Sequence, residues 1–444
     1  MAYLLADPAV LLKIVKQQKR GIPAGIASVC TAHPVVLEAC LRQAAKDGEM
    51  LLVEATCNQV NQFGGYTGQT PAAFVENLTR LARQVNFPMQ QLLLGGDHLG
   101  PYAWRKETSA SAMAKSAQLI ADYVSAGFRK IHLDTSMPCS DDPVGGLALS
   151  TSASRTVALC ALAEQAAQAC PQHPKPVYVI GSEVPSPGGA TELNETIKVT
   201  TVQDAAETLE IYTKEFARAG LQEAWERVAA LVVQPGVEFG DDTITGYERA
   251  RSAALQRFIR QVPGVVFEAH STDYQRPEAL RQMVEDQFAI LKVGPALTFA
   301  YREAVLALEG IENAWLGQRD DVTLSNLKDT LLVAMRQEPR YWSDYYHGAP
   351  HAVECQLVYS YSDRIRYYWH VPEVQSALQR LLTNLRRFPP PLTLVSQFLP
   401  VQYAQIREGM LGQDPQGWLW DGIQAVWQIY AAACRQNPER VQNA

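Results

Sequence analysis

The sequence predicts an α/β fold, namely a (β/α)8 TIM barrel followed by a mainly helical C-terminal region. Three observations support this prediction. Eight short apolar runs recur between residues 25 and 297, a stretch with helical periodicity follows each run, and strand-like runs disappear after about residue 310. We therefore expect a barrel over residues 1–310 and a mainly helical region over residues 311–444.

The eight runs are nearly continuous in apolar character, which is typical of strands that are covered on both faces of a parallel sheet. Eight strand–helix units in about 300 residues fit a closed barrel better than an open, doubly wound sheet. The predicted strands are residues 25–29, 50–56, 92–98, 130–136, 177–184, 231–239, 265–271 and 289–297.

The segments between the runs carry an apolar stripe opposite charged residues, as amphipathic helices do. The clearest cases are residues 72–85, 112–127 and 204–220. The last two end at Gly127 and Gly220, and glycine is a frequent helix stop signal. The direction from strand to helix is thereby fixed at two places in the chain.

Composition and charge exclude several functional classes. The 444 residues carry a net charge of −7 without any Lys/Arg block, so nucleic acid is not an expected partner. No apolar stretch reaches the roughly 20 residues that span a bilayer, and residues 1–20 predict an amphipathic helix instead of a targeting segment. Eight cysteines without C-x-x-C pairs predict free thiols. We expect a soluble, cytoplasmic protein.

Ionisable residues stand at or near the ends of seven of the eight runs. Because working residues of such barrels lie at the carboxyl ends of the strands, position along each run is itself informative. An unpaired buried carboxylate costs several kcal/mol, so packing alone does not explain these charges. We expect a polar pocket at this end of the barrel, formed by Glu54, Asp97, His98, Asp134, Glu183, Glu238, His270 and Lys292.

Two imidazoles and one carboxylate from different strands can bind a divalent cation, and His98, Glu238 and His270 form the predicted ligand set. The alternative is that both histidines are satisfied within a polar core and that Glu238 pairs with an arginine. His132 is a weaker candidate because it lies in the middle of a predicted strand, and His33 lies in the loop after the first strand.

Two glycine-rich segments follow predicted strands. The segment NQFGGYTG (residues 61–68), which includes Gly65, could bring backbone N–H groups close to an oxygen-rich ligand, or it could be an ordinary surface turn. Neither a P-loop nor a G-x-G-x-x-G helix start is present, so no nucleotide is expected. The segment SPGG (residues 186–189) predicts a mobile loop that carries Glu183.

The chain resembles a known family through many motifs in one order. The GatZ/KbaZ family, the companion subunits of class II tagatose-1,6-bisphosphate aldolase, shares the segments SVCTAHP, EATCNQVNQFGGYTG, GGDHLGP, KIHLDTSMPC, GSEVPSPGG, VVQPGVEF, EAHSTDYQ, ILKVGPALTFA and SDRIRYYW. Members have been described as stabilising aldolase subunits, as tagatose-6-phosphate kinases and as 4-epimerases of ketohexose 6-phosphates. A kinase is not expected here because no ATP-phosphate cradle is present.

The wider resemblance is to class II aldolases, whose Asp-His pair on the third strand supplies a proton-transfer group and a metal ligand. Asp97 and His98 match that pair, and His270 looks like a later ligand. The sixth strand departs from the pattern, because it has GVEFG where aldolases have a histidine. If the metal is kept, the resemblance implies that Glu238 replaces an imidazole.

These resemblances imply metal-dependent 4-epimerisation of tagatose 6-phosphate and fructose 6-phosphate by retro-aldol and aldol steps. The metal would be Zn²⁺, Mn²⁺, Co²⁺, Ni²⁺ or Mg²⁺, and the catalytic residue Asp97 or Glu183 would take the proton of the C4 hydroxyl group. The alternative is a non-catalytic subunit that stabilises a class II aldolase, and we also expect a homo-oligomer. The predicted substrate contacts are Glu54, Asn58, Gly65, Asp134, Ser271, Asp273, Lys292, Arg364 and Arg366.

Overall fold

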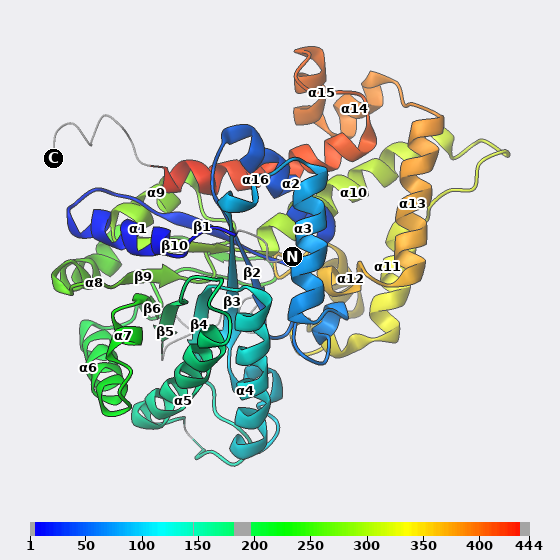
Figure 1. Cartoon of the computed structure of the whole chain (residues 1–444). Coiled ribbons are helices and arrows are strands. Elements are labelled where there is room, and N and C mark those ends of the chain that lie inside the picture. Colours follow the sequence, from blue (N-terminus) through cyan, green and yellow to red (C-terminus); the bar gives the residue numbers. More distant parts are fainter. Residues whose placement is uncertain (1–4, 145, 182–196, 436–444) are drawn as a thin grey trace.

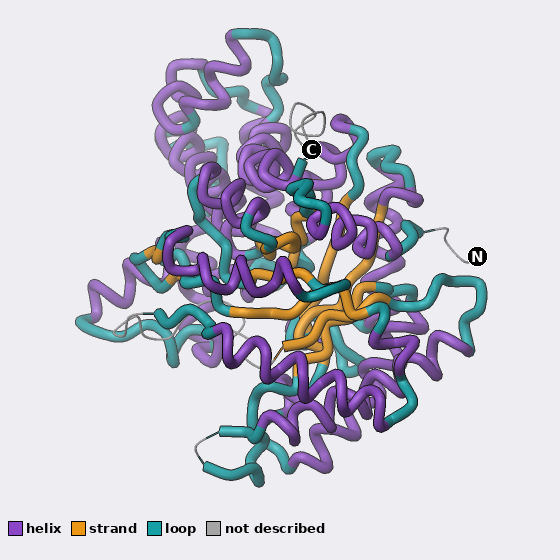
Figure 2. The backbone as a smooth tube through the Cα atoms, turned by 90° about the vertical axis from the view of Figure 1, so that its left-hand side faces the viewer, coloured by secondary structure: helices purple, strands orange, loops and turns teal. Residues whose placement is uncertain are grey.

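The computed structural model describes residues 5–144, 146–181 and 197–435, and its centre is a closed parallel barrel (Figure 1). Neighbouring strands follow the order β1-β10-β9-β6-β5-β4-β3-β2. Helices surround the strands on the outside (Figure 2). The fold prediction is confirmed. The barrel strands are β1 (Ile26–Cys30), β2 (Leu51–Thr56), β3 (Leu92–Leu99), β4 (Lys130–Asp134), β5 (Val177–Gly181), β6 (Val228–Val233), β9 (Val266–Ala269) and β10 (Phe288–Val293).

The sixth predicted run is displaced in the structure. It was expected to cover residues 231–239, with Glu238 at its end, but β6 ends at Val233 because Gly236, with φ 91°, turns the chain out of the barrel. The amide oxygen of the Gln234 side chain accepts the N–H groups of Gly236 and Val237, at 2.8 and 3.1 Å, and so stabilises this turn. Glu238 lies instead in β7 (Glu238–Phe239), which pairs antiparallel with β8 (Ile244–Thr245).

The helices that follow the strands pack their apolar faces onto the barrel. The predicted helices are confirmed within a few residues, and Gly127 follows one of them in the left-handed conformation, φ 105°. The helices of this part are α1 (Ala9–Lys19), α2 (Pro34–Asp47), α3 (Pro71–Gln84), α4 (Ser109–Ala126), α5 (Leu149–Gln168), α6 (Val202–Arg218), α7 (Gln222–Trp225), α8 (Arg249–Gln261) and α9 (Pro277–Glu285).

The C-terminal region is helical, as expected, and it is continuous with the barrel. Residue 310, the predicted boundary, lies inside α10, which follows the last barrel strand directly. The helices of this region are α10 (Pro295–Leu316), α11 (Leu327–Gln337), α12 (Pro350–Tyr359), α13 (Pro372–Arg387), α14 (Leu392–Phe398), α15 (Pro400–Arg407) and α16 (Pro415–Cys434). None of the helices in the described ranges combines the length and apolar character needed to cross a membrane.

The last helix returns to the barrel and supports its mouth. Helix α16 packs against α2, α9 and α10 (Figure 1). The hydroxyl of Tyr430 on α16 donates a hydrogen bond of 2.5 Å to the backbone carbonyl of Thr272, in the loop after β9. The hydroxyl of Thr272 donates in turn to the carbonyl of Lys292 on β10. The C-terminal helix therefore holds the loop that follows β9, and that loop is in turn bonded to β10.

Candidate active site

Asp97 and His98 are consecutive residues of β3, and in a regular strand their side chains would point to opposite faces. The pairing of β3 with β4 is irregular between Gly96 and Leu99, and His98 adopts a left-handed backbone with φ 48°. Local irregularities of this kind redirect side chains next to active sites. As a result, both Asp97 and His98 line the same pocket.

Three imidazoles, one on β3, one on β4 and one directly after β9, form a triangle near Asp97. The ring centroids of His98 and His132 are 5.2 Å apart, those of His98 and His270 are 4.9 Å apart, and those of His132 and His270 are 5.3 Å apart. All three side chains are buried. Three histidines from different strands are a common ligand set of catalytic zinc sites.

A buried carboxylate holds each imidazole. Ion-pair contacts of this kind fix the orientation and tautomer of metal-binding histidines. They join His98 Nδ1 to Asp134 Oδ2 at 2.7 Å, His132 Nδ1 to Asp97 Oδ1 at 2.8 Å, and His270 Nε2 to Glu268 Oε1 at 2.9 Å.

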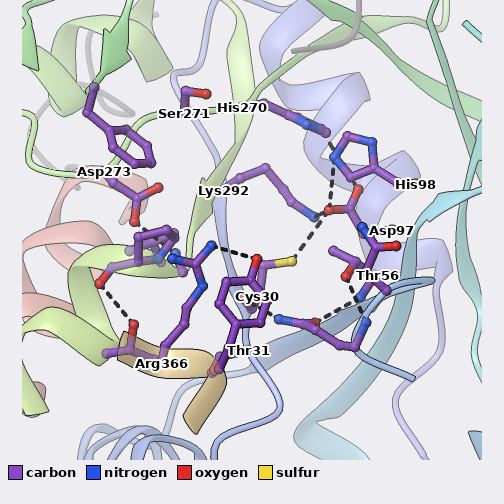
Figure 3. A pocket seen from close by; sticks show the side chains of 18 of the residues that line it. Cys30, Thr31, Thr56, Asp97, His98, His270, Ser271, Asp273, Lys292 and Arg366 are labelled. Atoms are coloured by element: carbon purple, nitrogen blue, oxygen red, sulfur yellow. Dashed lines mark hydrogen bonds and ion pairs between the residues drawn. The ribbon is translucent and has the colours of Figure 1, made fainter. Parts of the chain in front are cut away.

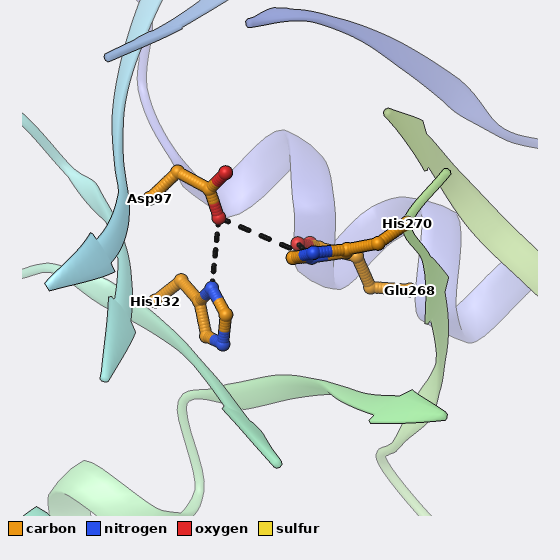
Figure 4. Close-up of side chains that lie close together, drawn as sticks. All are labelled: Asp97, His132, Glu268 and His270. Atoms are coloured by element: carbon orange, nitrogen blue, oxygen red, sulfur yellow. Dashed lines mark hydrogen bonds and ion pairs between the residues drawn. The ribbon is translucent and has the colours of Figure 1, made fainter. Parts of the chain in front are cut away.

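Four of these side chains could hold a divalent cation. Asp97, His132, Glu268 and His270 each offer one donor atom, and the four atoms lie within 4.8 Å of one another (Figure 4). His132 Nδ1 lies 3.2 Å from the backbone N–H of His98 as well as 2.8 Å from Asp97. One tautomer cannot satisfy both contacts: a protonated Nδ1 can donate to Asp97, whereas a deprotonated Nδ1 can accept the N–H of His98 or coordinate a cation.

The charges around this group also fit a cation. Burial lowers the pKa of His270 to about 4, so this imidazole is neutral at pH 7 and can coordinate a metal. Burial disfavours the charged form of the free His98 ring, but Asp97 and Asp134 outweigh burial and raise its pKa. When the His98 ring is neutral, as a metal ligand must be, four buried carboxylates face two ammonium groups and two negative charges remain for a divalent cation to balance. These groups are Glu54, Asp97, Asp134 and Glu268, with Lys130 and Lys292.

The Asp97 carboxylate remains charged in this setting. Burial alone would raise its pKa, but the His98 ring and the Lys292 ammonium outweigh that effect and hold the pKa well below its usual range. Lys292 Nζ lies 2.9 Å from Asp97 Oδ2, and the thiol of Cys30 lies 3.4 Å from the same oxygen. A charged carboxylate at the pocket wall can accept a proton from a bound hydroxyl group.

Below the pocket, two lysines and two glutamates form ion pairs inside the barrel. Lys130 Nζ lies 2.6 Å from Glu54 Oε1 and 2.7 Å from Glu268 Oε2, and Lys292 pairs with the other oxygen of Glu54. Gly95 leaves room for Glu54, since a Cβ at position 95 would lie 2.6 Å from Glu54 Cγ. The first glycine of the motif GGDH, Gly95, therefore makes room for a buried charge.

The pocket has two chemically different ends (Figure 3). Asp97, His98 and His270 lie at one end. Asp273 and Arg366 lie at the other, which we call the arginine end and which also includes Tyr367. The C-terminal region thus contributes directly to the pocket, because Arg366 and Tyr367 come from a short 3-10 helix, Arg364–Tyr368.

The guanidinium of Arg366 is held rigidly. Its Nη1 donates to the carbonyls of Ser362 and Asp363, and its Nη2 donates to the Tyr367 hydroxyl at 3.1 Å. Arg364 lies behind it and stacks on the ring of Tyr345. Opposite Arg366, burial raises the pKa of Asp273 to about 6, and Asp273 Oδ1 accepts the N–H groups of Gly294 and Ala296 at the start of α10.

The structure distributes the predicted site residues over three places. Asn58, Asp97, His98, His270, Ser271, Asp273, Lys292 and Arg366 line the pocket. Among the described residues, Glu54, Gly65, Asp134, Glu238 and Arg364 do not line it. Gly65 donates its N–H to the Asn61 side chain at 3.0 Å, in the turn that begins its 3-10 helix. Glu183 lies outside the described residues.

Glu238 lies beside the pocket and outside the group of four candidate ligands. Its carboxylate accepts the N–H of Phe239 and a hydrogen bond from Ser271, but burial still raises its pKa to about 7. Whether Glu238 binds a metal stays a prediction. His132, which the sequence favoured less, takes part in the candidate group, and Glu268 and Lys130 were missed.

A pattern that could have identified the missed residues is period-two polarity within two strands. In KIHLD the polar residues Lys130, His132 and Asp134 alternate with apolar ones, and in EAH the polar residues Glu268 and His270 do the same. Alternate residues of a barrel strand point inward, so this spacing places all five on the interior face.

Comparisons with known proteins identify relatives of this chain. The family described as D-tagatose-1,6-bisphosphate aldolase subunit GatZ/KbaZ-like matches residues 11–435. A protein described as a "probable tagatose 6 phosphate kinase" from Sinorhizobium meliloti 1021 is 44% identical, with a TM-score of 0.84, over 92% of this chain and 100% of that one.

Two aldolases are more distant. The YdjI aldolase of Escherichia coli K12 is 11% identical over 87% of this chain and 98% of its own, with a TM-score of 0.41. The fructose-bisphosphate aldolase of Campylobacter jejuni is 13% identical over 86% and 94%, with a TM-score of 0.46. Likenesses this weak carry no argument about activity. The match over residues 11–435 shows that the chain belongs to the GatZ/KbaZ-like family of D-tagatose-1,6-bisphosphate aldolase subunits.

Proposed function

We propose that the protein catalyses divalent-metal-dependent 4-epimerisation of ketohexose 6-phosphates, interconverting tagatose 6-phosphate and fructose 6-phosphate. The observation that carries this proposal is the position of Asp97. Its charged carboxylate lies at the pocket wall, His98 Nε2 is 3.7 Å from one of its oxygens, and His270 Nε2 is 3.9 Å from the other. Proton transfer and metal binding are thereby available at one place.

The imidazoles of His98, His132 and His270 would hold the cation, so that His132 takes the ligand role that was predicted for Glu238. When bound, a divalent cation supplies a Lewis acid for the carbonyl and hydroxyl oxygens of the ketose. Measurements of metal affinity can distinguish the set of three imidazoles from the set predicted from the sequence, in which Glu238 stands in place of His132. Loss of affinity in His132→Gln with little change in Glu238→Gln supports the three imidazoles, and the reverse supports Glu238.

Asp97 would accept the proton of the C4 hydroxyl group. The C3–C4 bond then breaks, C4 becomes an aldehyde carbon, and the electron pair of the bond remains on the C1–C3 fragment as an enediolate. The aldehyde turns its other face toward C3, the bond forms again, and Asp97 returns the proton to the C4 oxygen. The result is inversion at C4 with no net gain or loss of atoms.

The arginine end suits the phosphate group. In a ketose 6-phosphate, the phosphate stays on the C4–C6 fragment after the bond breaks, so one anchor can retain the aldehyde while it turns. Arg366 is the pocket-lining guanidinium in the described part of the chain, and guanidinium groups bind phosphate through paired N–H donors. Lys292, also predicted to contact substrate, is engaged with Glu54 and Asp97.

The test is to incubate the purified protein with Mn²⁺ or Zn²⁺ and fructose 6-phosphate in D₂O. We expect tagatose 6-phosphate without deuterium at C4, because the C4–H bond is never broken in the retro-aldol route. Asp97→Asn should be nearly inactive, and Asp242→Asn, an exposed carboxylate changed in the same way, should retain full activity. Deuterium at C4, or equal activity in both variants, would contradict the proposal.

A second candidate is a non-catalytic subunit of a class II aldolase, and the description of the matching family favours it. This function depends on the outer surface and not on Asp97. Addition of the protein to a class II tagatose-1,6-bisphosphate aldolase should then stabilise that enzyme, and Asp97→Asn should do so equally well. Turnover of fructose 6-phosphate by the isolated protein would instead support the epimerase.

A further inference from the structure

Six buried side chains form a closed ring inside the barrel, in which three carboxylates alternate with two ammonium groups and one neutral imidazole. Successive contacts run from His270 to Glu268 at 2.9 Å, to Lys130 at 2.7 Å and to Glu54 at 2.6 Å. Glu54 pairs with Lys292, Lys292 lies 2.9 Å from Asp97, and Asp97 lies 3.9 Å from His270. We call this set the charge ring, and its members are Asp97, Lys292, Glu54, Lys130, Glu268 and His270.

In the charge ring, Lys130 contacts Glu54 and Glu268, whereas Asp97 and His270 are the members proposed to transfer a proton and to bind the metal. Its side chain is 0% exposed and does not line the pocket, so it cannot touch a bound substrate. A buried ammonium group is costly unless its partners are close and well oriented. Lys130 lies between two carboxylates. Glu268 connects it to His270, and Glu54 connects it through Lys292 to Asp97.

The ring also determines what Glu268 can do. One of its oxygens contacts His270 Nε2 and the other contacts Lys130 Nζ, so both oxygens are already engaged within the protein. A carboxylate bonded to an imidazole orients that ring. Glu268, which belongs to the group of four candidate ligands, therefore also fixes the position of the His270 ring.

We infer that Lys130 is a positioning residue for the metal site. Through Glu268 on one side, and through Glu54 and Lys292 on the other, it fixes His270 and Asp97 relative to each other. This inference rests on the metal site of the proposed function. Its readout is metal affinity, so it can be tested even if the bound metal supports no epimerisation.

Electrostatic attraction alone and a positioning role predict opposite effects of Lys130→Met on metal affinity. Removing the positive charge in Lys130→Met makes the site more negative, and simple attraction would then bind a divalent cation more tightly. If Lys130 positions His270 and Asp97, the same change disorders the ligands and weakens binding. The direction of the change in metal affinity therefore separates positioning from bulk electrostatics.

The experiment measures the dissociation constant of Co²⁺ and its visible absorption spectrum in the full-length protein. In Lys130→Met we expect binding weakened by about 10- to 100-fold, the range typical of residues that orient metal ligands, and an altered Co²⁺ spectrum. Glu268→Gln, which keeps the side-chain shape, should weaken binding likewise and covers the case in which Lys130→Met does not fold.

Glu164→Gln is the matched control, because Glu164 Oε2 forms a partly buried ion pair with Arg227 at 2.6 Å, outside the charge ring. Its Co²⁺ affinity and spectrum should equal those of the wild type. Tighter or unchanged Co²⁺ binding in Lys130→Met, or equal losses in Glu268→Gln and Glu164→Gln, would overturn the inference. Normal Co²⁺ binding by a wild type that does not epimerise would refute only the proposed function.

Discussion

The stability of the protein at different pH values, without and with a metal, can show how burial and metal binding each act on Glu238. The carboxyl group of this residue is buried, and the pKa rises from 4.5 to about 7 because the charged form loses its hydration. The folded state consequently binds more protons than the unfolded state between pH 4.5 and 7. The contribution of this residue to stability is fully present below pH 4.5 and is lost as the pH rises to 7.

The size of the effect follows from the pKa difference. One pKa unit corresponds to about 1.4 kcal/mol, so the buried charge costs at most about 3 kcal/mol above pH 7. Glu238→Gln removes the charge and keeps an acceptor oxygen for Phe239. In EDTA we expect the variant to unfold at higher urea concentration than the wild type at pH 8, and at a similar concentration at pH 4.5.

Repeating the urea titration with Zn²⁺ tests the predicted ligand role. If Glu238 binds the metal, Zn²⁺ should stabilise the wild type much more than Glu238→Gln. If the three imidazoles hold it, Zn²⁺ should stabilise both proteins equally. A variant that is less stable than the wild type at pH 8 in EDTA would refute the reasoning, because the charged form would then be favourable in the folded protein.

Three further predictions concern the pocket. Asp97→Asn should lower kcat by about 10² to 10⁴ with little change in sugar-phosphate affinity, and calorimetry with fructose 6-phosphate would detect a loss of binding that contradicts this role. EDTA should abolish epimerisation and Zn²⁺, Mn²⁺ or Co²⁺ should restore it, whereas full turnover in metal-free protein would exclude metal catalysis. Arg366→Met should weaken binding of fructose 6-phosphate by about 10- to 100-fold but leave that of fructose nearly unchanged, and equal losses for both sugars would place the phosphate elsewhere.

The barrel could be predicted because its signal is local. Each strand is a short apolar run and each helix has its own amphipathic pattern, so both can be identified without knowledge of long-range contacts. The error at the sixth strand also has a local cause. The apolar residues on both sides of Gln234, Pro235 and Gly236 look like one run, although the turn at Gly236 ends the strand at Val233.

The site could be predicted only in part, because it depends on which residues of different strands face each other. Asp97, His98 and His270 stood out since charge at a strand end is unusual. Lys130, at the amino-terminal end of β4, and Glu268, inside β9, did not, because a buried charge at these positions is tolerable only with a partner that the sequence cannot show. Their partners are on other strands of the barrel.

The hydrogen bond from Tyr430 to Thr272 has a consequence for synthesis of the chain. The two residues are 158 positions apart, so at about 5 to 20 residues per second Thr272 leaves the ribosome about 8 to 30 seconds before its partner. The loop between His270 and Asp273 is therefore translated long before the helix that supports it. A nascent chain can close its barrel of strands and still await α16 before this side of the pocket is rigid.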